Sequence, residues 1–383
     1  MMTVFSRVRT PAQAEELEGS VLQRRLVTTM FVALAISVSL AGVNLFGQAA
    51  GAKGAPTVVP GYTPPRGPDG HPDLTGTWEH NAATPLQRPD ELKGRTMLTD
   101  EELRNMERTA AQLFKGDTDA AFGDSVYTAT LRNVLGKEKG FISTDTTGNY
   151  DAFWVVGRWF EKRTALITNP EDGKLPAATP QAEKRRAEQA AYRRLHPYDG
   201  PEDIALGQRC VTGSVPMLGA GYNNYYQIVQ TPSTFAVNME MRHDTRMIQI
   251  GNRPHLPKDV RLWLGDPVGR WEGDTFVVDS TNFRDDSPVG GGGGGGGATA
   301  TTHIIEKFSL AGPDALKYEV TVDDPATWTK PWTAVEIMRR TNELIYEYAC
   351  HEANEAMSGT LNGARVLERK AAEQGRPTGS RQQ

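Results

Sequence analysis

The chain has 383 residues, of which 38% are hydrophobic, and it carries a formal net charge of −5. This length allows one large domain or two modest ones, and the hydrophobic fraction supports a core while placing part of the chain outside it. The charged residues form neither a basic stripe nor an acidic tail, which argues against nucleic acid and anionic membrane surfaces as partners.

The N-terminal segment has the pattern of an export signal. Two arginines, Arg24 and Arg25, precede an apolar run over residues 26–46, and the small residues 50–52 follow. This order is typical of a secretory signal peptide. We predict an N-terminal extension with a signal peptide over 1–52 (signal about 24–52), and a periplasmic or secreted product without stable membrane insertion after cleavage. The alternative is an uncleaved anchor, because the run is long enough to cross a bilayer.

A Pro- and Gly-rich linker is predicted over residues 53–72, followed by a single β-rich domain over 73–367. The domain begins with Gly76-Thr77-Trp78, which resembles the first strand of lipocalin-like barrels, where the Trp closes one end. The alternative is an ordinary first strand with a buried Trp.

Two peripheral helices are predicted. Thr99 and Glu102 form a capping box, which predicts a helix over about 99–114. Thr179 followed by Pro180 predicts the start of a second helix over about 180–195, with few large apolar residues and therefore a solvated surface.

The remaining pattern is that of β-structure. Arg270-Trp271, the turn Gly273-Asp274 and residues 275–279 predict a tight hairpin, and apolar residues alternate with polar ones on both sides of it. We expect an antiparallel β-meander, either a lipocalin-like barrel or a half-barrel, in a mainly β (α+β) protein. Its further strands are predicted within 153–156, 164–168, 225–228, 235–241, 247–250, 303–310, 316–322, 332–339 and 344–350.

Two segments are expected to lie outside the packed structure. Eight consecutive glycines at 290–297 predict a mobile loop over 286–301, because glycine loses the most conformational entropy on ordering. The polar residues 368–383 predict a disordered tail.

The chain has two cysteines, Cys210 and Cys350. In an exported protein an even number of cysteines favours a disulfide, and two buried free thiols are the alternative.

No established metal, phosphate or nucleophile motif occurs, and we predict neither a metal site nor a cofactor. His243, oriented by Asp244, is a candidate general base between two predicted strands; an ordinary hairpin tip is the alternative. His351 and Glu352 form a second candidate pair, although in a regular strand they would point to opposite faces.

A surplus of aromatic residues favours a cavity for an apolar or amphipathic small molecule. The candidate ligand-binding residues are Trp78, Glu240, Trp271, Tyr346 and Tyr348.

An ordered set of segments within residues 70–367 is similar to a family of exported bacterial proteins that are common in soil and water and are usually labelled hypothetical. The resemblance implies export and no defined activity, so it assigns no catalytic residue, and the glycine run departs from the family's pattern. The segments are 72–78 (PDLTGTW), 164–176 (TALITNPEDGKLP), 222–232 (YNNYYQIVQTP), 269–283 (GRWEGDTFVVDSTNF), 322–332 (VDDPATWTKPW) and 346–352 (YEYACHE).

Three functions remain open at this point. The first is a module that binds an apolar or amphipathic small molecule in a barrel-like cavity. The second is a periplasmic hydrolase or isomerase that uses His243 or His351 with a nearby carboxylate. The third is a structural protein that contacts other components of the cell envelope.

Overall fold

The computed structural model describes residues 54–115, 120–141, 157–213, 215–218, 222–285, 287–289, 297–352 and 354–374. The predicted export signal, the predicted strand at 153–156, most of the predicted glycine loop and the end of the predicted tail lie outside these residues.

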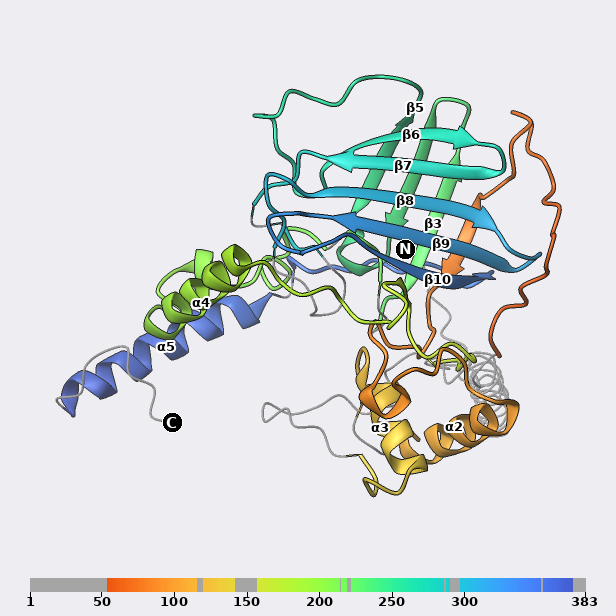
Figure 1. The fold of residues 1–383 in the computed structure, drawn as a ribbon. Coiled ribbons are helices and arrows are strands. Elements are labelled where there is room, and N and C mark those ends of the chain that lie inside the picture. Colours follow the sequence, from red (N-terminus) through yellow and green to blue (C-terminus); the bar gives the residue numbers. More distant parts are fainter. Residues whose placement is uncertain are drawn as a thin grey trace, which may run out of the picture. The chain divides into compact units, whose positions relative to one another are not determined.

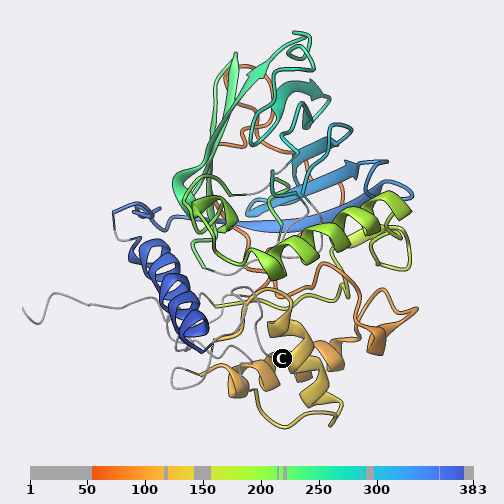
Figure 2. The same cartoon turned by 90° about the vertical axis from the view of Figure 1, so that its left-hand side faces the viewer.

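Nine strands close into a mixed β-barrel, and one short strand lies outside the ring. The first strand joins the two ends of the sheet by pairing with both β3 and β10, so the sheet is a barrel rather than a half-barrel. Figures 1 and 2 show β3, β4 and β5 in one wall, facing β7, β8 and β9. In chain order the barrel strands are β1 (Gly76–Glu79), β3 (Tyr225–Gln230), β4 (Thr234–Met239), β5 (Thr245–Ile250), β6 (Asp266–Glu272), β7 (Thr275–Thr281), β8 (His303–Leu310), β9 (Ala315–Asp323) and β10 (Trp332–Thr341).

The predicted hairpin is confirmed as β6 and β7, joined at Gly273-Asp274. The prediction of an antiparallel meander is wrong for one pair of strands, because β5 and β6 run parallel. A parallel pair needs a long connection, which residues 251–265 supply, whereas a hairpin needs only a tight turn. The short strand β2 (Ile167–Asn169) pairs with β10 outside the ring.

Buried and partly exposed side chains alternate along the strands, and the buried ones fill the barrel. On β9 the buried residues Leu316, Tyr318, Val320 and Val322 alternate with partly exposed ones. Directly opposed residues share a face, so the pairing register carries this inward face from strand to strand around the ring. The interior is therefore largely packed with aromatic and aliphatic side chains.

Trp78 lies on the strand that closes the ring and is fully buried. Its indole Nε1 donates to the Leu74 carbonyl at 3.0 Å, and the Arg340 guanidinium stacks over the ring at 4.2 Å. Gly76 has a φ of 146°, and a Cβ there would collide with the Arg340 guanidinium. The Gly-x-Trp pattern thus fits a close contact between the first and last barrel strands.

The described part of the chain contains four helices rather than the predicted two: α2 (Asp100–Leu113), α3 (Ser125–Val134), α4 (Pro180–Leu195) and α5 (Glu355–Glu373). Thr99 forms the predicted capping box with Glu102 at the start of α2. Helices α2 and α3 share a second apolar cluster that includes Met106, Tyr127 and Leu131. Helix α5 extends past residue 368, so the prediction of a disordered tail from that position is wrong.

The predicted strand at 344–350 is also wrong. Residues 342–349 form neither a helix nor a strand of the sheet. We call this segment the strap, because the predicted Cys210–Cys350 disulfide, which the structure confirms, ties its end to the loop before β3. The Asn354 amide donates to the Gln208 carbonyl at 2.8 Å beside this disulfide. Within the described residues no helix is long and apolar enough to cross a membrane.

Candidate functional site

The predicted pair of His243 and Asp244 does not form. The Nε2 atom of His243 accepts a hydrogen bond from the Tyr348 backbone amide at 2.7 Å. The Asp244 carboxylate instead accepts from the Thr212 hydroxyl at 3.1 Å and from the Gly213 amide. His243 has a left-handed φ of 53° in the turn between β4 and β5, and the two side chains serve different neighbours. His243 therefore fastens the strap.

Glu240 has a similar position beside the strap. Its side chain is buried, and its carboxylate accepts from the backbone amides of Tyr225 at 3.3 Å and Tyr346 at 3.2 Å. Burial raises the pKa of Glu240, although these two amides act in the opposite direction. The carboxylate is thus used in holding the strap to the barrel.

The remaining predicted site residues are scattered. His351 and Glu352 are exposed at a turn, and Tyr346 on the strap is 61% exposed. Tyr348 is partly exposed beside it. Trp271 lies on β6 and stacks on His71 at 4.5 Å. The structure brings neither the catalytic candidates nor the five ligand-binding candidates together around one cavity.

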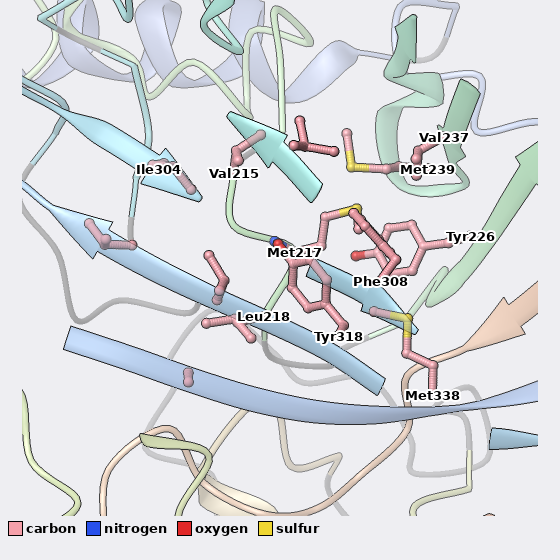
Figure 3. Close-up of a cluster of buried hydrophobic side chains, with 14 of the residues drawn as sticks. Val215, Met217, Leu218, Tyr226, Val237, Met239, Ile304, Phe308, Tyr318 and Met338 are labelled. Atoms are coloured by element: carbon pink, nitrogen blue, oxygen red, sulfur yellow. The ribbon is translucent and has the colours of Figure 1, made fainter. Parts of the chain in front are cut away.

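A cavity of about 140 Å³ lies where residues 215–218 and 222–224 approach the barrel, and we call it the mouth cavity. Figure 3 shows Met217 and Leu218 of this loop lying among side chains of several barrel strands. Apolar and polar groups share its wall, and none of the five predicted ligand-binding residues lines it. The lining residues are His80, Gly213, Pro216, Met217, Leu218, Tyr222, Asn223, Asn224, Tyr226, Met239, Met241 and Arg242.

His80 is the lining residue with acid–base chemistry. Its side chain is 3% exposed, and its Nδ1 lies 3.3 Å from Oε1 of Glu336, which is 1% exposed. The contact is close, but its angles fall short of hydrogen-bond geometry. The Tyr226 ring packs on the imidazole at 4.6 Å. Burial raises the pKa of Tyr226, and the phenol keeps its proton.

A second set of buried polar side chains, Arg246, Glu306 and Tyr318, supports the loop that carries Met217 at the mouth cavity. Arg246 and Glu306 form a two-pronged ion pair inside the barrel, at 2.8 and 2.5 Å. The Tyr318 hydroxyl donates to Glu306 at 2.8 Å and accepts from the Met217 amide at 3.2 Å. Burial, followed by the Glu306 charge, raises the pKa of Tyr318, which therefore stays protonated and can donate. This chain of contacts fixes Met217 in the cavity wall.

The sequence contained a signal for these charged residues. Glu306 and Glu336 each fall between two apolar residues of the inward-facing set, and Arg246 precedes Ile248 on the same face. A charge at an inward position marks a buried polar group that needs a partner. His80 has no such signal, because it follows the short strand β1 and meets Glu336 only through the β1–β10 pairing.

A larger groove of about 870 Å³ lies near β2, on the outside of the barrel. Several of its charged groups already have partners: Lys174 pairs with Asp90 at 2.7 Å, and Arg163 pairs with Glu161 at 2.6 Å. The mouth cavity has fewer charged residues in its lining and contains the buried imidazole, so we place the candidate site there. In the part of the chain that the structure describes, no group of three or more His, Cys, Asp or Glu side chains could hold a metal ion.

The fold and this cavity define the class as a β-barrel protein with a small mouth cavity. In comparisons with protein-family models and with curated proteins, no match to the chain is found.

Proposed function

We propose that the protein is an exported binding protein that takes a small apolar or amphipathic molecule in the mouth cavity. The observation that carries this proposal is the cavity itself, with Met217, Leu218 and Met239 in its wall beside a single buried imidazole. Ligand sites in proteins commonly combine an apolar wall with a few polar groups that fix orientation.

The size of the cavity indicates the size of the ligand. A volume of about 140 Å³ is close to the roughly 150 Å³ of an apolar cavity that accepts benzene. Methionine side chains adapt their shape to an apolar guest, and three of them line this cavity. We therefore infer a ligand with an apolar part of about one aromatic ring.

The compartment is part of the proposal. The arginine pair and apolar run before residue 52 have the order of an export signal, and the Cys210–Cys350 disulfide suits an oxidising environment. The contact between Trp78 and Arg340 and the closed barrel support a lipocalin-like protein, by analogy of fold. The segments that resemble exported bacterial proteins are in keeping with this proposal.

Toluene is a suitable first probe, with calorimetry as the measurement. Met241 is partly buried at the cavity, so Met241→Trp fills the cavity with little disturbance of the core. Met247 is 64% exposed on β5, and Met247→Trp is the matched control. We expect toluene to bind the natural protein and the control, and binding to be lost in Met241→Trp. Absence of binding to the natural protein, or equal binding to all three, would overturn the proposal.

A further inference from the structure

We propose that His80 is the hydrogen-bond acceptor of the mouth cavity, which therefore selects ring-sized molecules that carry a hydroxyl group, as phenols do. This inference rests on the proposed function and deepens it by naming the chemical class of the ligand.

The roles of the two imidazole nitrogens follow from their surroundings. A carboxylate oxygen only accepts, so the Glu336 oxygen at 3.3 Å favours the tautomer of His80 that carries its proton on Nδ1. Nε2 then keeps its lone pair, and it is the ring nitrogen left for the cavity that His80 lines. Glu336 is thus a positioning residue.

A buried cation also interacts with Glu336. Burial lowers the pKa of Arg158 to about 10, while the charges of Glu336 and Asp124 act in the opposite direction, so this guanidinium remains positive at neutral pH. With the proton of the imidazole on Nδ1, the lone pair of Nε2 can accept a hydrogen bond from a ligand.

The imidazole is also held in place. The His80 amide donates to the Asn224 carbonyl at 3.2 Å, and the Tyr226 ring packs against the imidazole. Other polar groups of the cavity wall have partners of their own: the Arg242 Nε donates to the Gly207 carbonyl at 3.2 Å, and the Asn224 amide donates to Asn81 at 2.9 Å. A preorganised acceptor therefore meets the ligand beside the apolar side chains of Met217, Leu218 and Met239.

Phenol and toluene test this inference, because they differ only in a hydroxyl or a methyl group on the same ring. Calorimetry on the natural protein should give phenol an affinity about tenfold higher than toluene, as expected for one well-placed hydrogen bond. In His80→Phe the order should reverse, because a buried hydroxyl without an acceptor is unfavourable. Unchanged toluene affinity in this variant shows that the cavity has survived the substitution.

A second measurement avoids the variant altogether. In the natural protein with ¹⁵N-labelled histidine, phenol should shift the Nε2 resonance of His80, and toluene should leave it in place. If toluene binds while phenol binds equally or more weakly and leaves Nε2 unshifted, this inference is overturned and the proposed binding function stands. If neither molecule binds, both proposals fail.

Discussion

The carboxylate of Asp266 is surrounded by hydrogen-bond donors that stabilise its negative charge. Its carboxylate accepts from the Arg253 guanidinium at 2.6 and 3.0 Å, from His255 Nδ1 at 3.1 Å and from the Leu256 amide at 2.9 Å. Burial alone would raise the pKa of Asp266, but these donors outweigh burial and lower it to about 2. The charged form is therefore the one that stabilises the fold.

A depressed carboxylate pKa gives stability that is present above the unfolded-state pKa and is lost as pH falls through the folded-state value. We expect Asp266→Asn to lower the free energy of unfolding by about 2 kcal/mol at pH 7, which corresponds to the shift from 3.8 to about 2. The difference between the two proteins should shrink as pH falls from about 4 to about 2. Denaturant unfolding at several pH values measures it, and a difference that stays constant over this range would contradict the account.

At the scale of the element, Gly269 shows how two strands come close to an aromatic core. A Cβ at this position would lie 2.5 Å from Cζ of Phe276 and 2.9 Å from Cγ2 of Ile248. Both neighbours are fully buried and cannot move far. The hairpin of β6 and β7 therefore packs on β5 only with glycine at this site.

Gly269→Ala should lower the free energy of unfolding by about 1–3 kcal/mol through overpacking. The matched control is Gly363→Ala in α5, where nothing lies within 4 Å of the added Cβ. This substitution should raise stability by about 0.5–1 kcal/mol, because alanine favours a helix more than glycine does. Urea unfolding compares the two, and a Gly269→Ala protein as stable as the natural one would be incompatible with the described packing.

Several helices and strands could be predicted from the sequence alone. Alternation of period two located β4, β8, β9 and β10, the turn at Gly273-Asp274 located β7, and the capping box located α2, because these signals are local. Helix α3 has a sequence rich in β-branched residues and is stabilised by packing on α2, which no local pattern reports. Helix α5 contains two glycines, Gly359 and Gly363, which weaken its helical signal.

The candidate site was less predictable than the fold, for a physical reason. The predicted residues His243 and Glu240 are polar at a turn between strong strands, and the structure uses both to fasten the strap. His80 and Glu336 meet only because the ring closes through β1 and β10, a long-range pairing that local propensity does not encode. The inward charge at Glu336 was the available signal for a buried polar group.

On the scale of the whole molecule, side chains fill most of the barrel interior, and the mouth cavity is the candidate ligand site. Barrel interiors of this strand number are usually occupied by side chains or hold one small ligand. Here the buried aromatic residues fill most of the interior, while the loop that carries Met217 and Leu218 leaves a space of about 140 Å³ against β3 and β4. The proposed binding function depends on that space.

The methionines allow this claim to be tested directly, because they report separately on the cavity and on the surface. The chain has 11 methionines. Met217, Met239 and Met241 line the cavity, and Met97 and Met247 are 51% and 64% exposed. The measurement is a toluene titration of protein labelled with ¹³C at the methionine methyl groups, followed by NMR. The account predicts shifts at Met217, Met239 and Met241 with Met97 and Met247 unchanged; no shift at the three cavity methionines would contradict it.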